Sequence, residues 1–183
     1  MQNGDVKNKI DFFSTPFGLK SAKLLQQIKV PFIKIASGEI TNHDLITYIS
    51  KMKIPMLVST GMTTISEIAE VVEIIKQHNC PFTLLHCVSS YPTLVKDANL
   101  STIQYLKNTF NVDVGFSDHT TGVEVSLAAV ALGASVIEKH FTLDKNMPGP
   151  DQKLSLDPSE FLEPVSYTHL RAHETREDRV CPL

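Results

Sequence analysis

Short apolar runs alternate along the chain with longer stretches in which apolar residues recur at helical spacing. The short runs are rich in β-branched residues and predict strands, whereas the longer stretches predict amphipathic helices. The predicted strands are Asp11 to Thr15, Phe32 to Ser37, Pro55 to Thr60, Phe82 to Cys87, Val112 to Ser117 and Ser135 to His140. The predicted helices are Leu19 to Ile28, His43 to Met52, Thr64 to His78, Leu100 to Asn108 and Val123 to Leu132. This alternation is typical of repeated βα units.

The third predicted helix shows the helical pattern clearly. Thr64 and Glu67 have the spacing of a capping box, in which each side chain bonds to the backbone N–H of the other residue. Apolar residues then recur on one face of the helix, and glutamates lie mainly on the other. The predicted strands are instead apolar on both faces, as buried parallel strands are. We therefore expect a parallel sheet covered by helices.

Polar residues cluster where nearly every predicted strand ends. An open doubly wound sheet binds its ligand at one switch point, whereas a TIM barrel collects polar groups from many strand ends on one face. The sequence therefore favours an α/β fold of the TIM (β/α)8 type. Such a barrel has eight strands and about 250 residues, so six predicted strands indicate an incomplete barrel. The clusters are Ser14 to Phe17, Ser37 to Glu39, Ser59 to Gly61, His86 and Cys87, Ser117 to His119, and Glu138 to His140.

The composition excludes several classes of protein. With 42% hydrophobic and 20% charged residues, the chain is globular rather than disordered. Its net charge of -3 offers no basic surface for nucleic acid, and it lacks the uninterrupted run of about 18 apolar residues that would span a membrane. Three cysteines make no disulfide framework, and the N-terminus lacks a signal-peptide pattern. We expect a cytoplasmic protein that acts on small molecules.

The segment from residue 164 to residue 183 departs from the βα pattern. It is dense in charge and offers little apolar face. His169 and His173 stand four residues apart in it, but no third metal ligand accompanies them. We expect residues 164–183 to be a non-native tail and residues 1–163 to form the partial barrel domain.

Two histidines lie at the carboxyl ends of the last two predicted strands. Because side chains alternate along a strand, Ser117 and His119 share one face, and Glu138 and His140 share one face of the next strand. The two histidines can therefore converge at one edge of the sheet. Two imidazoles near a carboxylate suit a divalent cation such as Mn2+, Zn2+ or Fe2+, with open positions for substrate and water. The alternative is that each histidine is a hydrogen-bonded structural residue.

One lysine and three serines from the strand ends form a second candidate set. Lys34, Ser37, Ser59 and Ser117 offer one positive charge and three hydroxyl donors, which suit an anion with phosphate and carboxylate groups. Lys34 interrupts an apolar strand, where a buried ammonium is costly unless it is paired. A structural salt bridge is the alternative explanation. Lys34 and Ser37 are three residues apart, so in a regular strand their side chains would point to opposite faces. Ser37 must therefore lie beyond the regular pleat if both residues contact one ligand.

Taken in order, six segments resemble the sialic acid synthase family over about Asp11 to Phe161. They are FFSTPF, KIASGEITN, LVSTGM, LLHCVSSYP, the long run from VGFSDHTTG through EKHFTLDKNMPGPD, and SLDPSEF. The resemblance implies strands 3 to 8 of a TIM barrel. It also implies a full-length protein that forms a domain-swapped homodimer through a C-terminal antifreeze-like domain, which this sequence lacks.

The resemblance also implies roles for individual residues. His119 and His140 would bind the metal, Mn2+ in most of the family, with Mg2+ or Co2+ as alternatives. Phosphoenolpyruvate would be held by Lys34, Ser37, Ser59 and Ser117, with Lys34 and Glu138 as the catalytic residues, and the amino sugar by Glu39, Tyr91 and Asp151. Ser89 would lie in the phosphoenolpyruvate region, where some relatives carry asparagine. Gly38 stands where the pseudaminic acid branch carries a bulky aromatic residue, which favours the neuraminic or legionaminic branches.

The implied reaction condenses phosphoenolpyruvate with N-acetylmannosamine or a related 2,4-diacetamido sugar, and it yields a nonulosonic acid and phosphate. One alternative is another phosphoenolpyruvate-dependent 3-deoxy keto acid synthase, which would need an extra cationic site for a sugar phosphate. The other is a non-catalytic sugar-binding barrel. Because six strands cannot close an eight-stranded barrel, we expect the isolated chain to be catalytically silent and poorly soluble.

Overall fold

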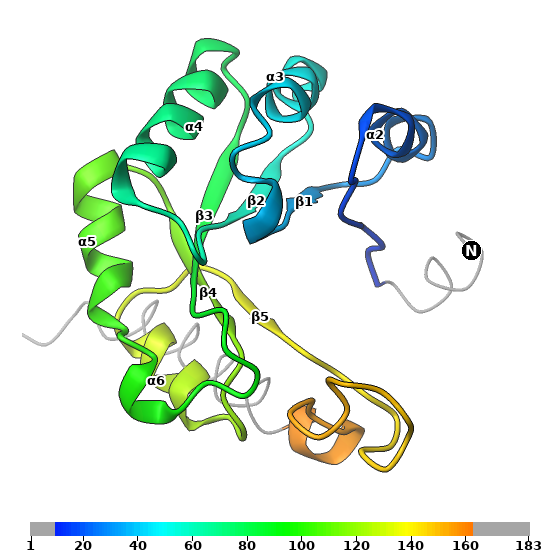
Figure 1. Ribbon diagram of the computed structural model, residues 1–183, viewed down its shortest axis with the longest axis vertical. Helices are drawn as coiled ribbons and strands as arrows, with labels where there is room; N and C mark the ends of the chain where they lie inside the picture. Colours follow the sequence, from blue (N-terminus) through cyan, green and yellow to red (C-terminus); the bar gives the residue numbers. More distant parts are fainter. Residues whose placement is uncertain (1–9, 163–183) are drawn as a thin grey trace, which may run out of the picture. The chain divides into compact units, whose positions relative to one another are not determined.

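The computed structural model describes residues 10–162 of the chain, in which strands and helices alternate (Figure 1). The strands are β1 (Ile33–Ile35), β2 (Met56–Ser59), β3 (Phe82–Cys87), β4 (Val114–Asp118) and β5 (Ile137–Lys139). The helices are α2 (Leu19–Gln27), α3 (His43–Met52), α4 (Ile65–Gln77), α5 (Ser101–Phe110) and α6 (Glu124–Ala131), with short 3-10 turns η1 (Ser37–Glu39) and η2 (Val95–Asp97). Within the described residues the sheet has the strand order β1-β2-β3-β4-β5. The chain has the expected α/β fold.

The chain divides into two compact units. The first contains the chain up to His86 together with Tyr105–Val114, and the second contains Cys87–Gln104 and the residues from Gly115 onward. No helix within residues 10–162 is long and apolar enough to cross a membrane. The tail predicted for residues 164–183 lies outside the described residues.

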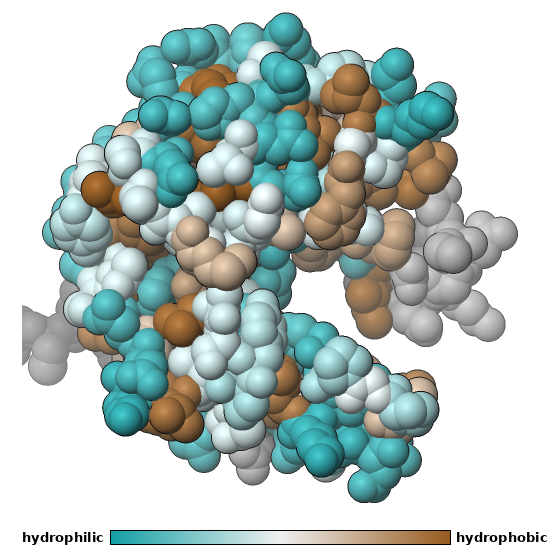
Figure 2. All heavy atoms as spheres, viewed as in Figure 1, coloured by the Kyte–Doolittle hydropathy of each residue, from teal (hydrophilic) through white to brown (hydrophobic). Residues whose placement is uncertain are grey.

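Strands β1, β2 and β3 of the first unit pair in parallel, with Ile35 opposite Val58 and Val58 opposite Leu84. These three side chains are fully buried. Helix α3 packs between α2 and α4, and α4 turns Ile68, Val71, Val72 and Ile75 toward the core. The outer surface of the α3 and α4 layer is mainly hydrophilic (Figure 2). Ile35, Val58 and Leu84 are register partners and form one apolar face of the sheet. The alternate positions of β1 and β2 carry Lys34 and Ser59, so the expectation of strands that are apolar on both faces is wrong here.

Helix α4 begins as its sequence predicts. The Thr64 hydroxyl accepts a hydrogen bond from the backbone N–H of Glu67, and the Glu67 carboxylate accepts one from the backbone N–H of Thr64. Both bonds of the capping box are therefore present. The Glu67 carboxylate accepts hydrogen bonds from the backbone N–H and from the hydroxyl of Thr64, and these bonds lower the pKa of Glu67 by stabilising its charged form.

In the second unit, β4 and β5 pair in parallel, with Ser117 opposite Glu138 and Asp118 opposite Lys139. Phe116 is buried on β4. A further parallel bridge joins Phe141 to Leu156, and Leu156 is also buried. This pairing places the ends of β4 and β5 next to each other.

The prediction of a strand over Asp11 to Thr15 is wrong for the structure. Only a single bridge forms there, between Ser14 and Ile33, and the Ser14 carbonyl accepts from the backbone N–H of Lys34 at 3.1 Å. Pro16 follows at once, and a proline has no N–H with which to continue a ladder. The described residues therefore form five strands instead of six.

Candidate functional site

The second unit brings His119 and His140 together. His119 directly follows β4 and His140 directly follows β5, so the parallel register places them at matching positions. Their ring centroids lie 5.3 Å apart. The predicted convergence of the two histidines is confirmed.

A backbone carbonyl fixes the orientation of the His119 ring. Nδ1 of His119 lies 2.8 Å from the carbonyl oxygen of Val88, which can only accept a hydrogen bond. Nδ1 therefore carries the proton in the neutral ring, and Nε2 keeps its lone pair. His119 is buried, and this burial lowers its pKa. A neutral imidazole with a free Nε2 is the form that binds a metal.

A serine and a glutamate connect β4 to β5 beside the histidines. The buried Ser117 hydroxyl donates to Oε1 of Glu138 at 2.6 Å and lies 3.5 Å from Nε2 of His119. Ser117 thus holds the Glu138 carboxylate on the side of His119 where Nε2 lies. This arrangement agrees with the prediction that Ser117 and His119 share one face of their strand and that Glu138 and His140 share one face of the next.

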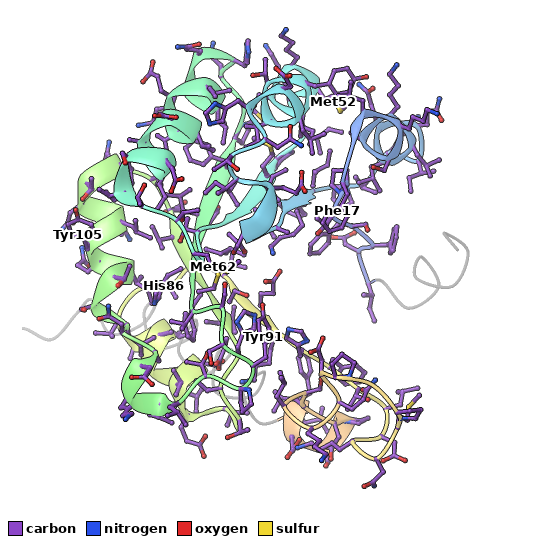
Figure 3. All side chains as sticks on the ribbon, viewed as in Figure 1. Phe17, Met52, Met62, His86, Tyr91 and Tyr105 are labelled. Carbon is purple, nitrogen blue, oxygen red and sulfur yellow. The ribbon has the colours of Figure 1, made fainter. Side chains whose placement is uncertain are left out.

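Tyr91 lies in the loop after β3 (Figure 3), and its ring is close to both histidines. Its ring centroid lies 4.2 Å from that of His119 and 5.7 Å from that of His140. Partial burial raises the pKa of the Tyr91 phenol, and nearby Cys87, Asp151 and Glu138 raise it further. The ring is nevertheless about half exposed at 52%, so a ligand could contact its outer face.

The predicted sugar-binding residue Asp151 also lies in this cluster. Its Oδ2 is 3.8 Å from Nδ1 of His140. Ser89 is half-buried in the loop between Val88 and Tyr91. The cluster of the second unit thus consists of Ser117, His119, Glu138, His140, Tyr91 and Asp151.

The donor set of this cluster fits a cation that takes two ligands from the protein. No group of three or more His, Cys, Asp or Glu side chains in residues 10–162 is arranged to hold a metal ion. His119 and His140 nonetheless offer two adjacent imidazoles, and the orientation of His119 leaves Nε2 available. A divalent cation bound there would keep open positions for substrate and water.

Hydroxyl groups gather at the ends of β1 and β2 in the first unit. Ser37 begins η1, just after β1, and its Oγ accepts a hydrogen bond from the backbone N–H of Gly61 at 3.0 Å. Ser37 thus lies beyond the regular pleat, which is the condition for Ser37 and Lys34 to contact one ligand. Ser59 ends β2 with its side chain buried, and its Oγ has no hydrogen-bond partner in the described part of the chain. An unpaired buried hydroxyl is costly, so Ser59 is suited to bind a ligand.

Two charged residues flank these serines. Lys34 is half-buried in the middle of β1 between the fully buried Ile33 and Ile35. Glu39 lies in η1, and its carboxylate accepts a hydrogen bond from the side chain of Asn42 at 2.8 Å. Asn42 in turn caps α3 by accepting from the backbone N–H of Leu45. The start of α3 therefore holds the Glu39 carboxylate in place.

The sequence analysis missed a buried polar network on the other side of β4 and β5. Asp118 and Lys139 form an ion pair of 3.0 Å with side chains that are 0% and 3% exposed. Asp118 also accepts hydrogen bonds from the backbone N–H and hydroxyl of Thr120 and from the hydroxyl of Ser126. The sequence did offer a signal for this network, because Asp118 and Lys139 carry opposite charges and directly follow Ser117 and Glu138. Side chains alternate along a strand, so both charged side chains lie on the face opposite to Ser117 and Glu138.

Comparison with known proteins identifies the family. The structure is an α/β protein with polar groups at the carboxyl ends of parallel strands, as in part of a TIM barrel. The model of the NeuB family matches residues 3–176, and the chain belongs to this family.

Several relatives have printed activities. N,N'-diacetyllegionaminic acid synthase of Campylobacter jejuni is 50% identical over 157 residues, which cover 84% of this chain and 47% of that protein. Pseudaminic acid synthase of the same species is 45% identical over 150 residues, covering 81% and 44%. The crystal structure of N-acetylneuraminic acid synthetase from Leptospira borgpetersenii is similar at a TM-score of 0.90 and 40% identity, over 97% of this chain and 62% of that one. The chain spans about half the length of the curated relatives it matches.

Proposed function

We propose that this chain forms part of a synthase that condenses phosphoenolpyruvate with an N-acetylated amino sugar to give a nonulosonic acid and phosphate. The observation that carries the proposal is the cluster in which His119 and His140 lie 5.3 Å apart beside the hydrogen-bonded Ser117 and Glu138. Membership of the NeuB family supports it, as do relatives that are synthases of diacetyllegionaminic, pseudaminic and N-acetylneuraminic acids.

The proposed reaction balances without an oxidant or reductant. The electron pair of the double bond of phosphoenolpyruvate forms a bond from C3 to the aldehyde carbon of the open-chain sugar, whose oxygen takes up a proton. Water adds at C2 and loses a proton. The C2 hydroxyl then gives up its proton and forms the keto group while the bond between C2 and the phosphate oxygen breaks, and phosphate leaves with that proton.

Each candidate residue has a role in this scheme. His119 and His140 would hold a divalent cation, which we propose to be Mn2+, and such a cation supplies Lewis-acid polarisation of the sugar carbonyl. Ser37, Ser59 and Lys34 bind the phosphate and carboxylate groups of phosphoenolpyruvate with hydroxyl and ammonium donors. Ser117 orients Glu138 through their hydrogen bond of 2.6 Å. In this scheme Glu138 accepts or returns a proton during the reaction.

The sugar would contact Glu39, Tyr91 and Asp151. Glu39 accepts from Asn42, and a carboxylate held in this way can accept further hydrogen bonds from sugar hydroxyl or amide groups. Gly38 lies next to Glu39, and a Cβ atom added at Gly38 would meet no described atom within 4 Å. We base the substrate preference on the residue type: the pseudaminic acid branch is expected to carry a bulky aromatic residue at this position, so Gly38 favours N-acetylmannosamine or a 2,4-diacetamido sugar.

The proposed function is tested in a version of the protein that has the full family length. Phosphate release is measured with Mn2+, phosphoenolpyruvate and each amino sugar, and metal content is measured in parallel. We expect His119→Ala and His140→Ala each to abolish Mn2+-dependent turnover and to lower the bound metal, since each removes one of two imidazole ligands. Normal turnover and metal content in both variants would refute the metal assignment.

The same assay separates the alternative functions. A 3-deoxy keto acid synthase of another kind would release phosphate fastest with a phosphorylated sugar that carries no N-acetyl group, and a sugar-binding barrel would release none. The homodimer implied for the full-length protein is part of the proposal, and its molar mass in solution tests it.

A further inference from the structure

The loop after β3 is held by one buried threonine. Thr93 is only 5% exposed, and its hydroxyl lies 2.8 Å from the carbonyl oxygen of Ser90 and 3.3 Å from that of Val88. Its backbone N–H donates to the carbonyl oxygen of His119 at 2.9 Å. Thr93 therefore links the loop to itself and to the residue that follows β4.

The same loop holds His119 at two points. The Val88 carbonyl accepts from Nδ1 of the His119 ring, and the Thr93 N–H donates to the His119 backbone. Between these two anchors the loop carries Tyr91, whose ring lies 4.2 Å from that of His119. The position of the loop thus determines the direction of Nε2 and the placement of the Tyr91 ring.

We propose that Thr93 is a positioning residue for this site. Its hydroxyl holds the Val88 and Ser90 carbonyls, so that Val88 keeps His119 in the tautomer with the proton on Nδ1 and Tyr91 stays over the ring. The effect of Thr93 on metal binding rests on the proposed function, because His119, the residue that Thr93 positions, is a metal ligand in that proposal.

The hydroxyl group and not the shape of Thr93 carries this role. Valine has nearly the same shape as threonine but cannot donate a hydrogen bond. Thr93→Val leaves the Val88 and Ser90 carbonyls without this donor, and the loop then loses a hydrogen bond that fixes it. Groups that orient a metal-binding histidine typically change metal affinity by about 10-fold to 100-fold when removed. Because Thr93 acts through the loop, we expect a loss near the lower end, about 10-fold.

The experiment compares four forms of the full-length protein. They are the parent, Thr93→Val, Thr93→Ser and Ser50→Ala. Ser50 is a matched control because its fully buried hydroxyl donates to the Ile46 carbonyl at 2.7 Å within α3. The measurements are calorimetric titration with Mn2+, the 15N shifts of the His119 imidazole in metal-free protein, and thermal unfolding.

The expected result separates positioning from general stability. Thr93→Val should bind Mn2+ about 10-fold more weakly and show a mixture of His119 tautomers. Thr93→Ser should restore both properties, because it keeps the donor. Ser50→Ala should lower the unfolding temperature while leaving Mn2+ affinity and the His119 shifts unchanged. If Thr93→Val does not fold, Thr93→Ala removes the donor without adding bulk and takes its place.

Two other outcomes have distinct meanings. Unchanged Mn2+ affinity and unchanged His119 shifts in the variant that lacks the hydroxyl would overturn the role of Thr93. If the parent itself binds no Mn2+, the metal part of the proposed function fails. The imidazole shifts of the metal-free protein then decide the Thr93 inference, with an unchanged tautomer refuting it and a mixture supporting it.

Discussion

Removing one member of the buried Asp118–Lys139 pair should strongly destabilise the second unit. The two side chains are almost fully buried, with 3.0 Å between Nζ and Oδ2. Truncating one partner of such a pair costs about 3–5 kcal/mol, because the remaining charge stays buried without its counter-ion. Native domains have a total stability of about 5–15 kcal/mol, so a single substitution here should be easy to measure.

The contacts predict that the two single variants differ. After Lys139→Met, the Asp118 carboxylate still accepts from the N–H and hydroxyl of Thr120 and from the Ser126 hydroxyl, so we expect a loss of about 3 kcal/mol. After Asp118→Asn, the Lys139 ammonium keeps the carbonyl oxygen of Thr120 but loses its counter-charge. We expect this variant to lose about 5 kcal/mol.

The double variant removes both charges together. Asp118→Asn with Lys139→Met should be more stable than the sum of the single losses predicts, by about 2–3 kcal/mol. Urea unfolding followed by circular dichroism gives the free energy of unfolding of each variant. The comparison requires that the dependence of this free energy on urea concentration is the same in all variants.

An exposed ion pair in the same unit gives the control. Lys145 and Glu160 form a pair of 2.6 Å whose side chains are 35% and 39% exposed. Lys145→Met should therefore cost less than about 1 kcal/mol. If Lys139→Met costs no more than Lys145→Met, or if the losses at Asp118 and Lys139 simply add, the reasoning about the buried pair is wrong.

Two further predictions concern the capping box and the substrate. Thr64→Ala should lower the free energy of unfolding by about 1 kcal/mol near neutral pH. Folding lowers the pKa of Glu67, because Thr64 donates hydrogen bonds to its charged carboxylate. The stability that these bonds contribute is therefore fully present above the pKa of Glu67 in the unfolded chain, and it is lost as the pH falls through the lower pKa of the folded protein. The difference between parent and variant should therefore shrink in acid, and growth of the difference would contradict this account. In a competition assay of the full-length protein, Gly38→Phe should slow turnover of N-acetylmannosamine or the 2,4-diacetamido sugar far more than Gly38→Ala does; equal effects would show that Gly38 does not face the sugar.

The helices and most strands could be predicted from the sequence because their signals are local. His43–Met52 is a helix over the predicted range, and the other helices differ from prediction by at most two residues at either end. Strand parity also predicted that His119 and His140 can converge, and it required Ser37 to lie past the pleat if Lys34 and Ser37 contact one ligand. The strand predicted at Asp11 to Thr15 failed, since a run of residues suited to a strand still needs N–H groups in register to form a ladder, and Pro16 has none.

Contacts between distant segments were decided only by the tertiary structure. The Val88 carbonyl lies 31 residues from His119 in sequence and yet orients its ring, and Thr93 supports both from the same loop. The conformation of that loop has no periodic signal, so no pattern of residue types indicates which carbonyl meets which imidazole. Local periodicity thus determines where the strands and helices form, and the packing of strands and loops determines which nitrogen of His119 remains free for a ligand.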